Sequence, residues 1–288
     1  MTVAQSHRID QSATIDPTAR IDPSAVIGPH CRIEAGAFIG PRCIIGAHTR
    51  LRPFAVIVQD TELGERNDVH SHAVLGGDPQ DRAFNPEVST GKLIIGNDCI
   101  FREGVTISRG TGDEVPTRIG SSCYFMAASH AGHNVQMGSF VTLANAVLIA
   151  GHARIGDRVN FGGGAVVHQF THIGEMAMFQ GISGVSMHVP PYCVVAGVNT
   201  VVSLNTVGMR RAGFTPEDRE RVKTAFRLIC ADRSGVSMTD RVAQLQAQDP
   251  QGPAMRFVDF VRDALAEKPP RARGICAARA RHGRGRTT

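Results

Sequence analysis

Two histidines with two small residues between them, His130 and His133, stand in the segment SHAGHN at residues 129–134. An imidazole loses its proton close to neutral pH and therefore suits a general base, and its nitrogens are also common metal ligands. The spacing alone is compatible with a base, a metal-ligand pair or two surface side chains. The backbone that carries the pair has to distinguish these possibilities.

Two further histidines, His152 and His168, follow His133 in the sequence. The chain repeats every six residues, and each interval between these histidines is close to three such six-residue units (hexads). The first interval is slightly longer and the second slightly shorter. If three hexads make one coil, such positions fall close to one column on successive coils, about 4.8 Å apart. We therefore expect the imidazoles to converge, with Gly151 and Gln169 beside them. Convergence favours a base with supporting groups. A zinc ion would need all donors aimed at one point, and no acid or cysteine is placed to help.

An internal repeat indicates a coil of three hexads. Aliphatic residues recur at every sixth position from Ile9 to Leu75, and the pattern resumes after pauses at 77–92 and 109–117. A period of six fits neither an amphipathic helix nor an alternating strand, but it fits a coil with three flat sides. We expect the aliphatic residue to point inward and the glycine that often follows it to support the turn. The sequence predicts a mainly β fold, a parallel β-helix with two external loops at the pauses.

The sequence pattern after Pro191 is typical of α-helices. Thr215, a proline and an acidic residue three positions on form the pattern of a helix start. We expect a β-helix over 1–197, a C-terminal α-helical domain over 198–267 and a disordered basic tail over 268–288. The tail holds seven Lys and Arg and no acid, so the formal net charge of +5 belongs to it rather than to the fold.

Composition excludes several classes of function. No charged start with an apolar run and no stretch of about 18 apolar residues occurs, so we expect a cytoplasmic protein without a membrane span. Trp is absent and Tyr numbers two, which argues against base stacking and hence against nucleic acid as a partner. The seven cysteines include no CxxC pair and are expected to be reduced packing residues.

Ordered motifs give the chain a specific resemblance. From residue 9 to about 265 it resembles the UDP-N-acetylglucosamine O-acyltransferase family, which opens lipid A synthesis. The motifs that carry the resemblance are GGDPQD at 76–81, REGVTISRGT at 102–111, HAGHN at 130–134, IAGH at 149–152, AVVHQF at 165–170, GVSMHVPPY at 184–192 and MRRAGF at 209–214. The resemblance implies that the β-helix is left-handed and that the protein is a homotrimer with its site between neighbouring subunits.

The resemblance also implies a reaction. A 3-hydroxyacyl group would pass from acyl carrier protein to the 3-hydroxyl of UDP-N-acetylglucosamine, without a cofactor or metal. His133 matches the general base and the N–H of Gly151 matches the oxyanion donor. Gly181 matches the residue that limits acyl length, and its missing side chain implies room for a long chain. Residues matching sugar, pantetheine-side and nucleotide contacts are Gln80, Asp81, His130, His152, His168, Gln169, Asn205 and Arg211.

Several positions depart from the family pattern. Asn134 stands where an aspartate is common beside the base, which reduces the help that a carboxylate would give. A lysine, a histidine, a glutamate and an arginine of the family are replaced by Ala83, Ser108, Val207 and Ala212. The sequence leaves two acceptors open, UDP-N-acetylglucosamine and its 3-amino analogue. The N-acyltransferase of the same pathway has an additional N-terminal domain, whereas the repeats here begin at residue 9. Alternatives from other classes are a zinc hydratase of the carbonic anhydrase type and a structural β-helix without catalysis.

Overall fold

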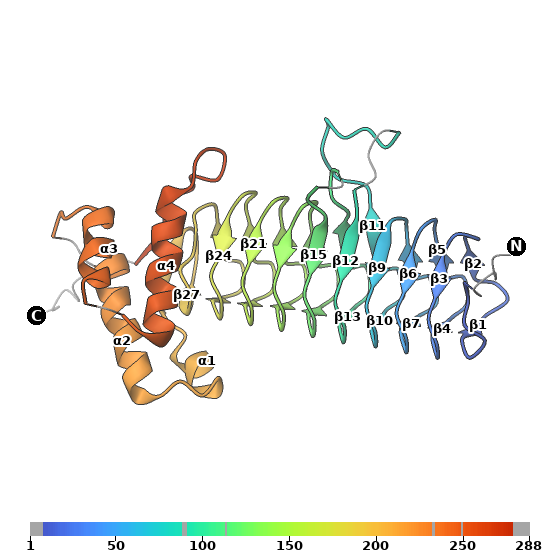
Figure 1. Ribbon diagram of the computed structural model, residues 1–288, viewed down its shortest axis with the longest axis horizontal. Helices are drawn as coiled ribbons and strands as arrows, with labels where there is room; N and C mark the ends of the chain where they lie inside the picture. The colour runs from blue at the N-terminus through green and yellow to red at the C-terminus, as the bar shows by residue number, and fades with distance from the viewer. Residues whose placement is uncertain (1–7, 88–90, 113, 232–233, 249, 279–288) are drawn as a thin grey trace, which may run out of the picture.

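A three-sided prism makes up most of the molecule. The computed structural model describes residues 8–87, 91–112, 114–231, 234–248 and 250–278. Short strands follow one another around the prism, and Ile15 pairs with Ile33 on the next coil. Figure 1 shows the coils stacked along one axis, with the helices gathered at the C-terminal end. The fold is a left-handed parallel β-helix with a C-terminal helical part, which confirms the predicted fold class.

Each side of the prism is one sheet. The first face contains β1 Thr14–Ile15, β4 Arg32–Ile33, β7 Arg50–Leu51, β10 Asp68–Val69, β13 Ile100–Phe101, β16 Tyr124–Phe125, β19 Thr142–Leu143, β22 Asn160–Phe161, β25 Met178–Phe179, β27 Cys193–Val195, β28 Thr200–Leu204 and β29 Ala277–Ala278. The second face contains β2 Arg20–Ile21, β5 Phe38–Ile39, β8 Val56–Ile57, β11 Val74–Gly77, β14 Thr106–Ser108, β17 His130–Ala131, β20 Leu148–Ile149, β23 Val166–Val167 and β26 Gly184–Val185. The third face contains β3 Val26–Ile27, β6 Ile44–Ile45, β9 Thr61–Leu63, β12 Leu93–Ile95, β15 Thr117–Ile119, β18 Gln136–Met137, β21 Arg154–Ile155 and β24 His172–Ile173.

The core is a column of aliphatic and aromatic side chains along the prism axis. The second residue of each two-residue strand points inward, and Ile39, for example, is fully buried while Phe38 beside it is exposed. Larger rings pack against each other between coils in a tilted arrangement, as in Phe161 and Phe179, whose ring centroids are 4.6 Å apart. Burying one apolar residue on each side of each coil supplies the main driving force for folding, because a single coil has no interior of its own.

The turns use glycine differently from the sequence-based expectation. The left-handed conformation occurs at the fourth position of the hexad, and non-glycine residues such as His30 (φ 58°) and Arg42 (φ 56°) adopt it. Glycine at the second position is required by space instead. A Cβ on Gly40 would lie 1.6 Å from the carbonyl oxygen of Val58 on the next coil. The glycines therefore permit close approach of neighbouring coils, and the sharp turn is made two positions later.

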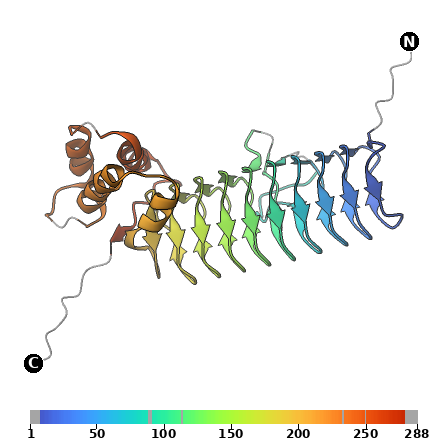
Figure 2. The same ribbon diagram turned by 90° about the horizontal axis from the view of Figure 1, so that it is seen from below.

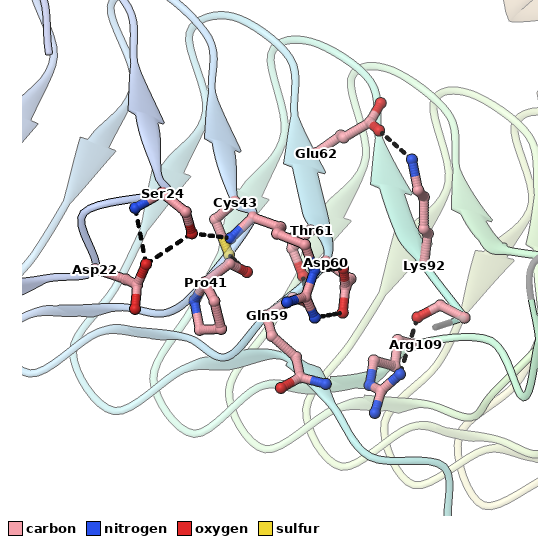
Figure 3. Close-up of polar contacts among 12 residues, drawn as sticks. Asp22, Ser24, Pro41, Cys43, Gln59, Asp60, Thr61, Glu62, Lys92 and Arg109 are labelled. Carbon is pink, nitrogen blue, oxygen red and sulfur yellow. Dashed lines mark hydrogen bonds and ion pairs between the residues drawn. The ribbon is translucent and has the colours of Figure 1, made fainter. Parts of the chain in front are cut away.

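Side-chain hydrogen bonds link the turns of neighbouring coils near the N-terminal end. Asp22 Oδ1 accepts from the backbone N–H of Ser24 at 2.8 Å, and Ser24 Oγ accepts from the N–H of Arg42 at 2.8 Å (Figure 3). The same arrangement recurs at Asp10 and at Asp16. These contacts satisfy turn N–H groups that no strand can pair.

The helical part begins where the strands end. Its elements are α1 Thr206–Arg211, α2 Pro216–Phe226, the π-helical turn η1 Arg227–Ala231, α3 Met238–Gln246 and α4 Gly252–Ala266. Thr215 caps α2 through a reciprocal hydrogen-bond pair with Asp218, as its sequence pattern predicts. Buried Val222 and Phe257 face the shared interior of α2 and α4. No helix in the described ranges is long and apolar enough to cross a bilayer.

Two features differ from the expected domain limits. The first face continues beyond residue 197, because β28 pairs antiparallel with β27. Residues 268–278, expected to be disordered, return from α4 to the prism and end in β29, which pairs with β28 (Figure 2). The physical reason is the apolar pair Ile275 and Cys276, which is buried against the prism despite the surrounding arginines. The remainder of the predicted tail, 279–288, lies outside the described residues.

Candidate active site

One corner of the prism, between the second and third faces, carries most of the predicted site. Here called the loop corner, it contains the turns 132–134, 150–152 and 168–170. The chain also leaves the prism at this corner between β11 and β12 and between β14 and β15. The three histidines lie on successive coils, but the unequal intervals place each at a different turn position, so His133 aligns with Gly151 and Gln169 rather than with His152 and His168. The three histidines lie near one corner rather than in one exact column, and the rings of His133 and His152 do converge, with centroids 5.0 Å apart.

His133 is held by the neighbouring amide. Its Nδ1 lies 2.8 Å from Asn134 Oδ1, and Asn134 Nδ2 donates to the carbonyl of Val115 at 2.7 Å. Because the amide nitrogen is committed to Val115, the amide oxygen faces the imidazole, and Nδ1 must be the donor. The Nε2 atom of His133 is then the basic nitrogen. Asn134 thus orients the ring as an aspartate would, without adding a negative charge.

Gly151 lies directly against that basic nitrogen. A Cβ at Gly151 would be 2.7 Å from His133 Nε2. In the described part of the chain, no hydrogen-bond acceptor meets the backbone N–H of Gly151. At the corner between the third and first faces, by contrast, the same turn position is capped from the next coil, since Ser139 Oγ accepts from Ser121 N–H at 3.0 Å. The loop corner therefore offers an unused N–H donor beside a base.

Two neighbouring imidazoles, those of His152 and His130, surround His133 and have lowered pKa values. The ring of His152 meets that of His133 edge to face, with centroids 5.0 Å apart, and stacks on Phe170 at 4.7 Å. Burial lowers the pKa of His152, and the positive charges of protonated His133 and of Arg271 lower it further. Burial also lowers the pKa of His130, whose Nδ1 lies 2.8 Å from Thr106 Oγ1. Both side chains are consequently neutral at neutral pH.

His168 and Gln169 lie on the next coil and are exposed. His168 takes Arg273 as its side-chain partner, with Arg273 Nη2 3.1 Å from His168 Nδ1. The carbonyl of Gln169 accepts from the same guanidinium at 3.1 Å. The two residues extend the loop corner by one coil toward the helical part.

The loop between β11 and β12 carries Gln80 and Asp81, both exposed. Asp81 Oδ1 accepts from Ala83 N–H at 2.9 Å and shapes a tight turn. Its carboxylate is near enough to His152 to oppose the lowering of that pKa. The loop therefore brings its polar turn toward the histidines.

Arg109 holds both ends of this loop. Its guanidinium is fully buried, and it pairs with Asp78 at 2.8 Å and donates to the carbonyl of Gly91 at 3.1 Å (Figure 3 shows the latter contact). It also lies over the ring of Phe84, 5.0 Å from the centroid. Figure 3 shows a second link at the loop end, the ion pair of Lys92 with Glu62 at 3.2 Å. In the sequence, Arg109 stands within the motif REGVTISRGT, and its position directly after a strand of the buried repeat is the signal that marks it.

The remaining predicted residues lie at other corners of the prism. Gly181 is exposed at the corner between the first and second faces. Arg211 borders a cleft of about 370 Å³ beside the turns between the third and first faces, lined by Asp157, Arg158, Glu175, Met176, Arg211, Ala212, Phe214 and Arg256. Asn205 caps α1 through Gly208 N–H and donates to the carbonyl of Met176, both at 2.9 Å. A single chain does not bring these residues to His133.

Metal-ligating groups do not assemble at the loop corner. In the ranges that the structure describes, no three histidine, cysteine, aspartate or glutamate side chains have the arrangement of a metal site. A repeat prism with loops at one corner and a helical end defines the class of hexapeptide-repeat proteins, and the loop corner places an oriented imidazole beside the N–H of Gly151.

Comparisons with known proteins define the family within that class. A sequence model described as UDP-N-acetylglucosamine O-acyltransferase, domain 2, matches residues 188–276, and one described as a GMPPB C-terminal domain matches 3–112. An acyl-[acyl-carrier-protein]--UDP-N-acetylglucosamine O-acyltransferase of an Anaeromyxobacter species (strain Fw109-5) is 44% identical over 65% of this chain and 72% of its own length. The same-named protein of Campylobacter concisus is 37% identical over 72% of this chain and 78% of its own length.

Solved structures agree with the sequence relatives. The UDP-N-acetylglucosamine acyltransferase of Bacteroides fragilis matches with a TM-score of 0.82 and 30% identity, over 91% of this chain and 99% of its own. That of Campylobacter jejuni matches with a TM-score of 0.78 and 30% identity, over 94% of this chain and 100% of its own. The chain belongs to the UDP-N-acetylglucosamine O-acyltransferase family.

Proposed function

We propose that this chain transfers a 3-hydroxyacyl group from acyl carrier protein to the 3-hydroxyl of UDP-N-acetylglucosamine, the first step of lipid A synthesis. The observation that carries the proposal is the placement of His133 Nε2 against Gly151, with Nδ1 anchored by Asn134. Family membership supplies the substrate class, and this geometry supplies the two groups that such a transfer needs.

In the proposed reaction, His133 Nε2 removes the proton of the sugar hydroxyl as the oxygen attacks the thioester carbonyl. The developing oxyanion accepts a hydrogen bond from the Gly151 N–H, which needs no rearrangement because nothing in the described chain occupies it. The imidazolium then returns its proton to the departing thiolate. Asn134 keeps the ring in the productive tautomer throughout.

The other candidate residues divide between the two substrates. Gln80 and Asp81 would contact the sugar from the loop, with His130, His152, His168 and Gln169 lining the adjoining surface. Arg211 would bind the diphosphate, a role that its exposed guanidinium permits and that Asn205 would assist from the start of α1. Gly181 would leave room for a long acyl chain, since its backbone is exposed.

A trimer with shared sites accounts for the separation of these residues. The second face carries outward apolar side chains that are 39–47% exposed in the single chain, namely Phe38, Leu148 and Val166. Such side chains suit burial against a second copy. We infer that the loop corner of one subunit meets the Gly181 and Arg211 surfaces of a neighbour.

Hybrid trimers test the shared site. His133→Ala and Arg211→Ala homotrimers are expected to be weakly active, whereas mixed trimers should regain part of the activity, because some interfaces then contain both native residues. Activity that never exceeds the average of the two parents would contradict sharing. Exchange between subunits is verified with differently tagged chains.

The proposed partners complete this picture. Acyl carrier protein is the donor that the relatives' name prints, and a cytoplasmic location is our prediction for a chain that uses it. Neither proposal requires a cofactor.

The decisive assay measures transfer to UDP-N-acetylglucosamine and to its 3-amino analogue from 3-hydroxyacyl carrier proteins of several chain lengths, with a chelator present. We expect chelator-resistant transfer that falls about 10²- to 10⁴-fold in His133→Ala. Loss of transfer under chelator would show that the reaction needs a metal, and equal turnover in the variant would remove His133 as the base. No transfer with any pair would favour a structural role.

A further inference from the structure

The returning segment 268–278, here called the C-terminal strap, is anchored on both sides of Arg273. Gly274 O accepts from the N–H of His188 at 2.8 Å, and Cys276 N–H donates to His188 O at 2.8 Å. The ring of His188 holds the strap a second time, with Nε2 2.9 Å from the carbonyl of Arg271. Because His188 Nδ1 accepts from His172 N–H at 2.9 Å, the ring hydrogen lies on Nε2 and donates to that carbonyl. The backbone of Arg273 is thereby fixed.

The side chain of Arg273 reaches the loop corner. One nitrogen, Nη2, lies 3.1 Å from both His168 Nδ1 and Gln169 O, and the guanidinium lies 5.9 Å from the ring centroid of Phe170. Its Nε is buried and makes no hydrogen bond in the described part of the structure. Contacts with the 168–170 turn therefore set the orientation of the head group.

These contacts select one tautomer of His168. A guanidinium only donates, so His168 Nδ1 must present its lone pair to Arg273. The same Nδ1 also lies 3.2 Å from the carbonyl of Gln169, so that removal of Arg273 would favour a hydrogen on Nδ1. Arg273 satisfies that carbonyl and the nitrogen together, which leaves the ring hydrogen on Nε2.

We propose that Arg273 is a positioning residue that holds His168 as the Nε2–H tautomer, so that His168 donates a hydrogen bond to an acceptor oxygen of the bound substrate. The catalytic part of this inference rests on the proposed function, whereas the tautomer does not. The strap thereby couples the helical end of the chain to the loop corner. Arg273, which composition assigned to a disordered basic tail, thus has a defined partner in His168.

Nitrogen NMR of protein labelled with ¹⁵N-histidine tests the tautomer directly. The His168 signals are assigned by their loss in His168→Asn. We expect Nε2–H in the native protein and a growing Nδ1–H population in Arg273→Met. Arg273→Lys should restore Nε2–H, since an ammonium also only donates. The matched control is Arg271→Met, which removes a charge from the same strap but leaves the Arg273 contacts in place.

Transfer kinetics provide the second readout. A lost hydrogen bond of ordinary strength lowers kcat/KM by about 3- to 30-fold in Arg273→Met, and Arg273→Lys should recover most of the loss. An Nδ1–H tautomer in the native protein, or a kinetic loss in Arg273→Met without a tautomer change, would overturn the inference. If the native protein shows the expected tautomers but no transferase activity, the result would count against the proposed function. The positioning of His168 by Arg273 would still hold.

Discussion

The two nitrogens of His133 have different tasks because they have different neighbours. Nδ1 is fixed by Asn134, whose amide is itself oriented by Val115, and Nε2 is left facing Gly151. An amide in place of a carboxylate keeps the orientation and removes the charge that would stabilise an imidazolium. The departure from the family pattern therefore affects the electrostatics of the base more than its geometry.

Replacing Gly151 by alanine should lower activity because the new methyl group displaces the imidazole of His133. The new Cβ would lie 2.7 Å from His133 Nε2, and the ring has to move away. A shift of about 1 Å in a catalytic group can lower turnover about 10²-fold, so we expect a loss of that order in steady-state transfer.

A double variant separates displacement from other effects of that methyl group. If Gly151→Ala acts only through the imidazole, adding it to His133→Ala should cause little further loss. Losses that multiply in the double variant would show that the methyl group obstructs substrate or the oxyanion donor instead. Near-native thermal stability of both single variants is the control for folding.

At the scale of elements, Arg109 makes an external loop part of a rigid scaffold. It contacts the start of the loop, the end of the loop and the middle of it, through Asp78, Gly91 and Phe84. A buried guanidinium with these partners fixes a segment that otherwise lies outside the core.

Arg109→Met should loosen the loop and weaken sugar recognition. We expect the KM for the sugar nucleotide to rise about tenfold or more, while the KM for the acyl donor changes less, because Gln80 and Asp81 lie on this loop. Initial rates with each substrate varied in turn measure the difference. Lys92→Met, which removes only the exposed ion pair with Glu62, is the control and should have little effect. Equal increases in both KM values would contradict a specific loop effect.

The second-position glycines should be intolerant of any side chain. Gly40→Ala places a Cβ 1.6 Å from the Val58 carbonyl oxygen, so two coils must separate, and we expect a loss of roughly 3 kcal/mol or more in stability. Gly163→Ala is the matched control, because its Cβ would lie 3.5 Å from the nearest atom. Urea midpoints followed by circular dichroism compare them. A Gly40→Ala midpoint equal to that of Gly163→Ala would refute the close-approach explanation.

At the scale of the whole molecule, the helical part contacts the prism through a half-buried histidine. The ring of His172 lies 4.4 Å from that of Phe260 on α4. Burial lowers the pKa of His172 to about 4, and the positive charge of Arg154 and interaction with His188 add to the effect. Arg271 acts in the same direction, while Asp263 opposes it. Between about pH 4 and pH 6.5, His172 is therefore neutral in the folded protein and protonated in the unfolded chain.

Stability should fall with acidification in a defined window. The lowered pKa means that the stabilisation is complete above pH 6.5, the ordinary histidine value, and is lost as the pH falls toward about 4. One histidine contributes about 1.4 kcal/mol per pH unit in that window, or roughly 3 kcal/mol in total. Urea midpoints measured from pH 7.5 to 4 report the loss. His172→Phe, which keeps a ring against Phe260, should have a shallower pH dependence; an unchanged slope would assign the effect to other groups.

The sequence by itself determined the prism, because one buried aliphatic residue at every sixth position leaves no other regular packing for the chain. It also located the turns that hold His133, Gly151 and His152, since local order fixes which residues share a corner. Tertiary structure alone decided the rest. The tautomer of His133 depends on Val115, which precedes β15 on the neighbouring coil, and the contacts of Arg109 and of Arg273 join segments separated by 31 and 105 residues. Hydrogen bonds between distant segments leave no periodic signal, because only the folded backbone brings their partners within reach.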